Sequence, residues 1–359
     1  MITLKHTYTV RRRSAFSLVE LLVSMTVLTI IMLMSVRFID QMQKTWTSSS
    51  ARLEQFREAR QAFEIITQSL RQATLNTYLT YEYNSGPTPT VPASKSEAPQ
   101  KYVRHSELQF VSDKASNLLG GESPEFKKNH AVFFQAPMGI SARTGYEGLQ
   151  RLLCGRGYFI KYGSDEAYRP KHVKEDRTRF RLWEYRPASE LNEVYSVTPG
   201  EWFANAANET IEASETATAP SNSRPIAENI VALIISPQVT AEDAKDRGTG
   251  TTWIAPQYAY DSTQVAGQSI NNVQGTQHLL PPVVVVTLVA IDEVSARRLQ
   301  ATNPKAVPEL IPDGIFTDSE KLVQDIATLE EKLQSLKLNY RVFSTSVPMR
   351  NSKWNQTRK

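Results

Sequence analysis

The chain has 359 residues, of which 40% are hydrophobic and 22% charged, so it can bury a sizeable core and is not intrinsically disordered. Its 41 lysines and arginines nearly balance 37 aspartates and glutamates, which excludes a nucleic-acid binder with a large basic face. A single cysteine, Cys154, excludes an intrachain disulfide framework and a zinc site built from several thiolates.

The N-terminal segment 1–15 is basic, and it accounts for the whole net charge of +4. It holds no acidic residue, and its basic residues are Lys5, Arg11, Arg12 and Arg13. An apolar run, 16–36, follows, in which Glu20 is the one charged residue. At 1.5 Å per residue this run forms a helix of about 31 Å, long enough for the hydrocarbon core of a bilayer. The positive-inside rule then keeps 1–15 in the cytoplasm and places the chain after Arg37 across the membrane.

Three interpretations of the apolar run compete. A secretory signal peptide has a shorter apolar region, of about 7 to 15 residues, and a small-residue cleavage site after it. Here the run is longer and continues into Arg37-Phe-Ile-Asp40. A plain signal anchor fits the length and the flanking charges, but it gives no reason for Glu20. An ionisable residue in a membrane span is costly and indicates a function by default, although a position near the interface would keep Glu20 hydrated.

The residues Ser14-Ala15-Phe16-Ser17-Leu18-Val19-Glu20 resemble the N-terminal motif of type IV prepilins and pseudopilins. In that family a short basic leader precedes a small residue, then Phe, then Glu as the fifth residue counted from Phe. The resemblance implies that prepilin peptidase cuts between Ala15 and Phe16 and methylates the new amino group of Phe16. Alanine stands where the family usually has glycine. The resemblance also implies that Glu20 pairs with the amino terminus of a neighbouring subunit, which offsets the cost of a charge in an apolar filament core.

A helical spacing of apolar residues continues beyond the membrane run, and no Gly or Pro occurs within 17–82. The pattern predicts one helix from about Ser17 to about Leu79, whose amphipathic second half, 37–80, turns an apolar stripe to a globular domain. A coiled-coil stalk is the alternative, but the seam is sparse and lacks a strict repeat. Segment 81–100 is rich in proline and is predicted to be a linker or an exposed loop.

The globular part, 101–347, is predicted to belong to the α+β class. Its predicted strands are short runs rich in β-branched and aromatic residues, at 107–111, 130–134, 157–162, 178–185, 229–235, 282–291 and 338–347. The run 283–291 is continuously apolar and predicts a central strand covered on both faces. The run 178–185 alternates arginines with aromatic residues and predicts a half-exposed strand on a solvated sheet face, with nucleic-acid base stacking as the weaker alternative.

Near the C-terminus, Thr317 and Glu320 have the spacing of a capping box, and apolar residues at helical spacing follow over 322–336. This amphipathic helix is expected to dock on the sheet of its own chain rather than on a partner subunit. A basic tail, 348–359, ends the sequence.

The residues offer little catalytic chemistry. The histidines are scattered without metal-ligand spacing, and Cys154 is predicted to be a buried, unreactive thiol. Gly155-Arg-Gly157 lacks the remaining residues of a dinucleotide or phosphate loop and predicts a turn. The carboxylates within 240–248 lack EF-hand spacing and predict a surface loop. We therefore predict no catalytic residue, no cofactor and no metal site, and expect that the protein is not an enzyme.

Three C-terminal segments, 229–235, 280–289 and 340–351, resemble successive segments of J-type pseudopilins and W-type minor pilins. Segment 290–298 additionally resembles the Verru_Chthon cassette protein C group, pilin-like proteins of Verrucomicrobia. These resemblances imply a pilin-like fold, in which a long N-terminal helix with a transmembrane first half packs on a mostly antiparallel sheet.

The resemblances also imply a structural role, as a minor pilin or pseudopilin in a type IV pilus-like or type II secretion-like filament. The expected partners are the inner membrane, prepilin peptidase and other pilin subunits, and no nucleic acid is expected. The expected topology is a single pass with a cytoplasmic N-terminus and a periplasmic globular domain, which is later extracted into a filament. A signal-anchored periplasmic enzyme or ligand-binding protein is the alternative, and a pilin with a globular domain that adheres to sugar or DNA is a third interpretation.

Overall fold

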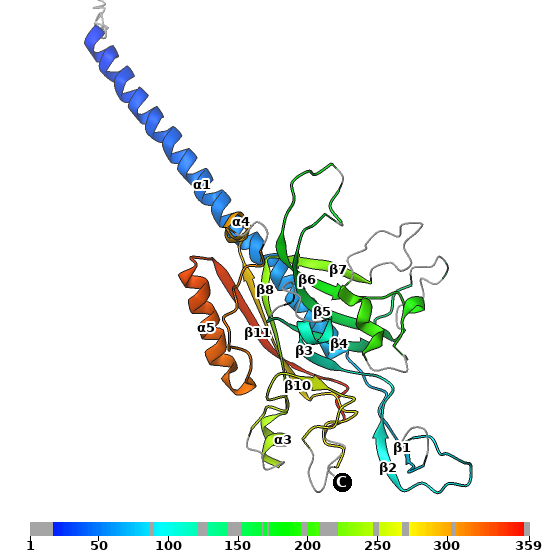
Figure 1. Cartoon of the computed structure of the whole chain (residues 1–359). Coiled ribbons are helices and arrows are strands. Elements are labelled where there is room, and N and C mark those ends of the chain that lie inside the picture. The colour runs from blue at the N-terminus through cyan, green and yellow to red at the C-terminus, as the bar shows by residue number, and fades with distance from the viewer. Residues whose placement is uncertain are drawn as a thin grey trace, which may run out of the picture. The chain divides into compact units, whose positions relative to one another are not determined.

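Helix α1, Leu18–Arg71, is the longest element of the computed structural model (Figure 1). The structure describes residues 17–85, 90–120, 126, 128–141, 145, 152–166, 168–170, 172–194, 200–207, 222–246, 251–267, 273–302 and 306–354. The chain divides into two units, Met1–Glu54 and Gln55–Lys359, and α1 runs from the first into the second.

The second half of α1 packs into the core of the globular unit, as its amphipathic pattern predicts. Its buried side chains follow the helical spacing and are Ala59, Ala62, Ile66 and Leu70, each at most 2% exposed. They share one core with strands of both larger sheets. The hydroxyl of Tyr158, which is fully buried, donates to Ser69 Oγ on the same helix at 2.9 Å. The apolar stripe is therefore confirmed as the face that holds the helix to the domain.

The predicted end of the helix near Leu79 is wrong, because α1 ends at Arg71. The backbone N–H of Thr74 donates to Gln135 O at 2.9 Å, so the chain has already left the helix for the sheet. Leu79 lies in strand β1, Tyr78–Glu82, where aromatic and β-branched residues favour extended structure.

Strand β1 pairs antiparallel with β2, Lys101–His105, to form a two-stranded sheet. The segment between these strands is the one predicted to be a linker or exposed loop. Tyr81 and Tyr102 lie opposite each other in this sheet, with ring centroids 4.6 Å apart. Figure 1 shows this pair of strands at the edge of the globular unit, away from the larger sheets.

The larger of the two remaining sheets has six strands in the order β7-β6-β5-β4-β3-β9, and all of its neighbouring strands are antiparallel. The strands are β3 (Val111–Lys114), β4 (His130–Ala136), β5 (Cys154–Gly163), β6 (Arg179–Tyr185), β7 (Ser223–Glu228) and β9 (Tyr260–Asp261). The predicted strands at 130–134, 157–162 and 178–185 are confirmed. Gly155 and Gly157 lie within β5, so the predicted turn there is wrong.

The predicted strand at 107–111 is also wrong, since only Val111 belongs to a strand. The backbone N–H groups of Leu108, Gln109 and Phe110 donate to side chains instead of to a neighbouring strand. Leu108 N–H donates to Ser106 Oγ at 3.1 Å, and Phe110 N–H donates to Ser262 Oγ at 2.8 Å. The Ser106 hydroxyl is a local acceptor of the kind that competes with a regular ladder, whereas Ser262 lies 152 positions further along the chain.

The other sheet has three strands in the order β11-β10-β8, again antiparallel. The strands are β8 (Ile230–Gln238), β10 (Val283–Ile291) and β11 (Tyr340–Pro348). All three were expected from their sequences. The central position predicted for the apolar run 283–291 is confirmed, because β10 lies between β8 and β11 and most of its residues are buried.

The shorter helices connect the strands. They are α2 (Ala115–Leu118), α3 (Ala241–Asp246), α4 (Glu293–Thr302) and α5 (Leu322–Ser335), with 3-10 turns at Ser189–Leu191, Glu201–Ala207 and Ser319–Lys321. Helix α3 replaces part of the surface loop predicted at 240–248. The hydroxyl of Thr240 accepts a hydrogen bond from Asp243 N–H at 3.1 Å, which caps the start of α3.

Helix α5 docks on its own chain, as expected, and contributes Leu322, Leu329 and Leu333 to the common core. The predicted capping box is wrong. The Asp318 carboxylate, not the Thr317 hydroxyl, accepts from Glu320 N–H, at 3.1 Å, and it caps the 3-10 turn before α5. Thr317 Oγ1 donates to Gly314 O instead.

A second core covers the opposite face of the six-stranded sheet, and we name six of its buried rings the aromatic cluster. The members of the aromatic cluster are Phe133, Phe159, Trp183, Tyr185, Trp202 and Phe203. Two of them come from the 3-10 turn Glu201–Ala207, which lies over the sheet. Strand β6 is therefore covered on both faces, and its predicted half-exposed, solvated face is wrong: six of its seven residues are buried. Its two arginines form ion pairs, described below.

The described part of the basic tail is packed rather than free. Asn351 Nδ2 donates to Ala73 O at 3.0 Å, and Lys353 Nζ donates to Thr77 O at 2.7 Å. Trp354 is 4% exposed and packs against Leu279. These contacts fix the segment that follows α1.

His130, the first residue of β4, is buried with its ring 4.8 Å from that of Tyr258. Its Nδ1 lies 3.1 Å from Ile235 N, from which it can accept a hydrogen bond, and 3.3 Å from Ile235 O, to which it can donate in the other tautomer. Burial lowers the pKa of His130 to about 4. The ring therefore stays neutral in the folded chain over a range where an unfolded histidine takes up a proton.

Because of His130, we expect the free energy of unfolding to be about 2 kcal/mol lower at pH 5 than at pH 7. Unfolded histidine binds a proton below about pH 6.5, whereas folded His130 does so only near pH 4, so stability present above pH 6.5 is lost as the pH falls. Urea unfolding of the full chain at both pH values measures the loss. His130→Gln keeps an acceptor for Ile235 N–H and should remove this share of the pH dependence, and an unaltered dependence would contradict the assignment.

Candidate functional site

The start of α1 carries the described part of the N-terminal motif. Ser17 directly precedes the helix, and its Oγ accepts a hydrogen bond from Glu20 N–H at 3.2 Å. Its carbonyl accepts from Leu21 N–H, also at 3.2 Å. Ser17 is thus the N-cap, and Ser17-Leu-Val-Glu20 has the capping-box spacing that sequence reasoning did not use. Glu20, exposed in the first turn, lies where the helix dipole favours a negative charge.

The remaining predicted site residues precede this point. Ala15 and Phe16, at the predicted cleavage position, and Arg11, Arg12 and Arg13, the predicted leader charges, lie outside the described residues. Glu20 is therefore the one predicted site residue whose surroundings the structure describes.

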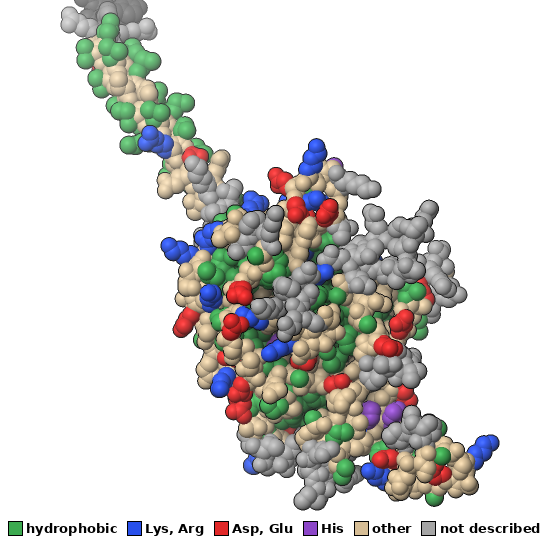
Figure 2. All heavy atoms as spheres, viewed as in Figure 1, with side chains coloured by type: hydrophobic (Ala, Val, Ile, Leu, Met, Phe, Trp, Pro, Cys, Tyr) green, Lys and Arg blue, Asp and Glu red, His purple; other side chains and the backbone are tan. Residues whose placement is uncertain are grey.

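The first part of α1 is apolar on every side. Among the described residues, one helical segment, Leu18–Gln43, is long and apolar enough to cross a membrane, with none of its apolar window buried in the chain. Its 26 residues make about 39 Å of helix, more than a hydrocarbon core of about 30 Å. Figure 2 shows hydrophobic side chains along this segment. An exposed apolar surface of this extent marks a membrane or protein interaction site.

The hydroxyl groups of this segment are bonded within the helix. Each donates to a backbone carbonyl three or four residues earlier, at 2.7 to 2.9 Å: Ser24 to Leu21, Thr26 to Val23, Thr29 to Met25 and Ser35 to Ile31. These donors therefore need no water, which suits a helix in hydrocarbon.

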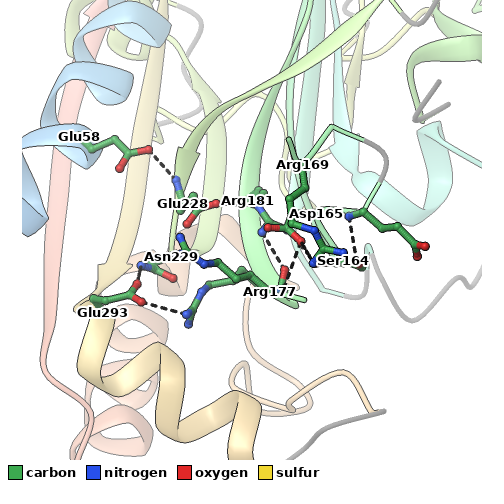
Figure 3. Close-up of polar contacts among 12 residues, drawn as sticks. Glu58, Ser164, Asp165, Arg169, Arg177, Arg181, Glu228, Asn229 and Glu293 are labelled. Carbon is green, nitrogen blue, oxygen red and sulfur yellow. Dashed lines mark hydrogen bonds and ion pairs between the residues drawn. The ribbon is translucent and has the colours of Figure 1, made fainter. Parts of the chain in front are cut away.

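A second polar arrangement lies in the globular unit, where α1 meets β7 (Figure 3). Glu58 of α1 accepts a hydrogen bond from Glu228 N–H at 2.9 Å. Burial raises the pKa of the Glu58 carboxyl, and the nearby charges of Glu228 and Glu293 act in the same direction. The carboxylate of Glu228 in turn pairs with Arg181 Nε at 3.1 Å. One side chain of the helix is thus joined to two neighbouring strands.

The adjoining part of this arrangement holds helix α4. Glu293, its first residue, pairs with Arg179 Nη2 at 2.9 Å and accepts from Asn229 Nδ2 at 3.0 Å. Arg181 also donates to the carbonyls of Gly163 and Arg177, both at 2.8 Å. The arginines of β6 are 4% and 1% exposed, whereas the side chains of their partners Glu293 and Glu228 are 28% and 33% exposed, so these ion pairs are half-buried. The arrangement fastens α1, β6 and α4 together and is structural.

Among the described residues, no group of three His, Cys, Asp or Glu side chains could hold a metal ion. Two histidines distant in sequence do meet, His105 and His278, with ring centroids 5.0 Å apart. Burial, followed by the charge of His105, lowers the pKa of His278 to about 4. Cys154 is free and fully buried, as predicted, and burial raises the pKa of its thiol.

The sequence family described as the prokaryotic N-terminal methylation motif matches residues 10–36. The match supports a type IV prepilin-like chain that is a substrate of prepilin peptidase, and it suggests a structural protein. Together with the apolar helix, it is consistent with a single-pass anchor in the inner membrane. No curated protein sequence matches the chain.

Proposed function

We propose that this chain is a minor pilin or pseudopilin, a structural subunit of a type IV pilus-like or type II secretion-like filament. The observation that carries the proposal is the coincidence of motif and helix: the methylation motif covers 10–36, and α1 begins at Leu18, two residues after Phe16. Prepilin peptidase cuts between Ala15 and Phe16 and methylates the Phe16 amine. The apolar segment then packs in the core of the filament, and Glu20 sets its register against the next subunit.

The proposed topology follows from charge. Arg11, Arg12 and Arg13 precede the apolar segment and hold the leader on the cytoplasmic side, so the globular unit lies in the periplasm. Partners in this role are prepilin peptidase, the inner membrane and other pilin subunits. The globular unit caps or contacts the next subunit.

The narrower affiliation is with J-type pseudopilins and W-type minor pilins, or with the Verru_Chthon cassette protein C group. The three segments that resemble J- and W-type chains, 229–235, 280–289 and 340–351, contribute to β8, β10 and β11. These strands form one sheet, so the resemblance covers one coherent part of the fold. This agreement supports the affiliation.

The amino terminus of the protein recovered from membranes of its own host tests the proposal. Mass spectrometry is expected to find a chain that begins with N-methylated Phe16. Ala15→Arg should block cleavage and leave the leader attached, because a large charged side chain replaces the small residue before the cut. Ala15→Gly, the matched control, keeps a small residue and should be processed at least as completely. An intact wild-type chain would contradict the proposal and favour a signal-anchored periplasmic enzyme or ligand-binding protein.

A further inference from the structure

Two histidines from distant parts of the chain lie next to each other at the end of the two-stranded sheet. His105 is the last residue of β2, and His278 lies in the segment that precedes β10. Their ring centroids are 5.0 Å apart, and the ring planes are inclined by 54°. The rings are therefore not stacked face to face. Stacked rings would keep their in-plane nitrogen lone pairs parallel, whereas inclined rings allow the lone pairs to converge on one point.

The separation of the two rings fits a pair of ligands of one ion. An imidazole nitrogen binds a late transition metal at about 2.0 Å, so the ion lies about 3.2 Å from the ring centroid. Centroids 5.0 Å apart then correspond to a nitrogen–metal–nitrogen angle of about 100°, between the square-planar and tetrahedral values. The same separation is ordinary for packed rings, so it does not identify a site by itself.

A buried nitrogen without a partner provides the second observation. His278 is 9% exposed, and its Nδ1 is buried with no hydrogen-bond partner in the described part of the chain. Such atoms are rare in folded proteins and indicate a bound ion or water. The low pKa of His278 keeps its ring neutral at pH 7, the form that binds metals. Its main chain is fixed on both sides, because its N–H donates to Ser262 O at 2.6 Å and its carbonyl accepts from Thr77 Oγ1 at 2.8 Å.

The charged groups near the pair have partners of their own. After burial and the charge of His105, Arg104 lowers the pKa of His278, whereas Glu107 and Asp261 raise it. Each of these three side chains makes hydrogen bonds within the chain. The two imidazoles are therefore the ligands that the chain offers. Imidazole favours Cu²⁺, Ni²⁺ and Zn²⁺, with Cu²⁺ bound most tightly, whereas Mg²⁺ and Ca²⁺ require oxygen ligands.

An ion at this position would connect two parts of the globular unit. At this end, β2 is held by Gln274, whose side chain accepts from Arg104 N–H at 2.8 Å and donates to Arg104 O at 2.9 Å. His278 belongs to the same segment as Gln274. A metal ion between His105 and His278 would thus add a second link between the two-stranded sheet and this segment.

We propose that His105 and His278 together bind one divalent late transition-metal ion, with Cu²⁺ bound most tightly and water completing the coordination. The ion fastens the two-stranded sheet to the segment 274–278. The sequence predicted no metal site, because these two histidines are far apart in the chain. The site stands apart from the N-terminal motif, and its assignment does not depend on the filament role.

Peptide-resolved hydrogen exchange of the full chain in nanodiscs tests the site. An ion bound to the folded form opposes local opening, so saturating Cu²⁺ should slow amide exchange in β1, β2 and 274–280 at least fivefold, and a chelator should reverse this. His105→Gln should abolish the slowing. His172→Gln, which removes an exposed histidine between β5 and β6, is the matched control and should retain it. Copper bound elsewhere on the chain is common to both variants and does not affect the comparison.

The ligand set is tested separately. The difference between the electron paramagnetic resonance spectra of copper-loaded wild type and His105→Gln should contain two imidazole nitrogens. Ni²⁺ and Zn²⁺ should slow exchange only at higher concentrations than Cu²⁺, and Mg²⁺ should have no effect. Slowing by Mg²⁺ equal to that by Cu²⁺ would overturn the imidazole ligands.

Two results would overturn the site itself. One is unchanged exchange of these segments at saturating Cu²⁺, and the other is slowing that persists in His105→Gln. His105 is half-buried, so its replacement disturbs the fold less than replacement of His278. Should His105→Gln unfold, His105→Phe keeps an aromatic ring against Tyr78 and lacks a metal-binding nitrogen, and it should show the same loss.

Discussion

Replacing Glu20 by alanine is expected to leave membrane insertion intact and to abolish incorporation into filaments. The substitution makes the apolar segment more hydrophobic, so insertion is not impaired. It removes the carboxylate proposed to pair with the amino terminus of a neighbouring subunit, and an unpaired buried charge is strongly unfavourable. Immunoblots of the membrane fraction and of sheared filaments from the host measure both quantities. Normal amounts of Glu20→Ala protein in sheared filaments would refute the register role.

The capping geometry of Ser17 allows the two roles of Glu20 to be separated. Glu20→Gln keeps a capping box, since glutamine also serves at this position, but it lacks the charge. We therefore expect Glu20→Gln to fail in incorporation. Ser17→Ala removes the cap that Glu20 N–H donates to, at a cost of about 1 kcal/mol of helix stability, and should still be incorporated. The reverse ranking of these two variants would assign Glu20 to helix capping alone.

The second large effect concerns Gly157 in β5, where alanine is expected to destabilise the globular unit by about 3 kcal/mol. A Cβ at Gly157 would stand 2.2 Å from Phe133 Cδ1 and 2.4 Å from its Cε1. The Phe133 ring is fully buried and stacks on Phe203, with centroids 4.3 Å apart and planes 9° apart, so it has no room to retreat. Urea denaturation of the full chain in nanodiscs, followed by tryptophan fluorescence, measures the change.

A smaller residue at the neighbouring ring provides the control. Phe133→Leu alone loses buried surface and is destabilising. Combined with Gly157→Ala, it also relieves the contact, so the double variant should lose less stability than the sum of the single losses. A Gly157→Ala loss below about 1 kcal/mol, or strict additivity, would show that the aromatic cluster adjusts around an added methyl group.

The sequence predicted those helices and strands whose burial can be inferred from the pattern of their own residues. The uniform apolar run of β10 indicated a central strand, and the spacing along α1 and α5 indicated their buried stripes. The burial of β6 could not be predicted, because Trp202 and Phe203, which cover one of its faces, come from a turn distant in sequence. The same holds for Gly157, whose missing side chain is explained only by a ring on the adjacent strand.

Among the candidate sites, too, a contiguous motif could be predicted from the sequence, whereas contacts between distant residues could not. The motif around Glu20 is contiguous and could be recognised from its residues, and the Ser17 cap was visible in the same stretch although we did not predict it. The ion pairs of Arg179 and Arg181 join residues more than forty positions apart. No spacing rule pairs Arg181 with Glu228 or Arg179 with Glu293 before the strands and α4 are placed.

The hydrogen bonds of the hydroxyl groups in the apolar segment affect how easily the segment can move from lipid to a protein surface. Because Ser24, Thr26, Thr29 and Ser35 bond to carbonyls of their own helix, the segment carries its polar partners with it. Moving it from acyl chains to a surface of packed helices breaks none of these bonds and requires no new ones. Within 18–36, Glu20 is the one side chain whose polar group still needs a partner outside the helix, so the preference of this stretch for one surrounding over another depends on a single carboxylate.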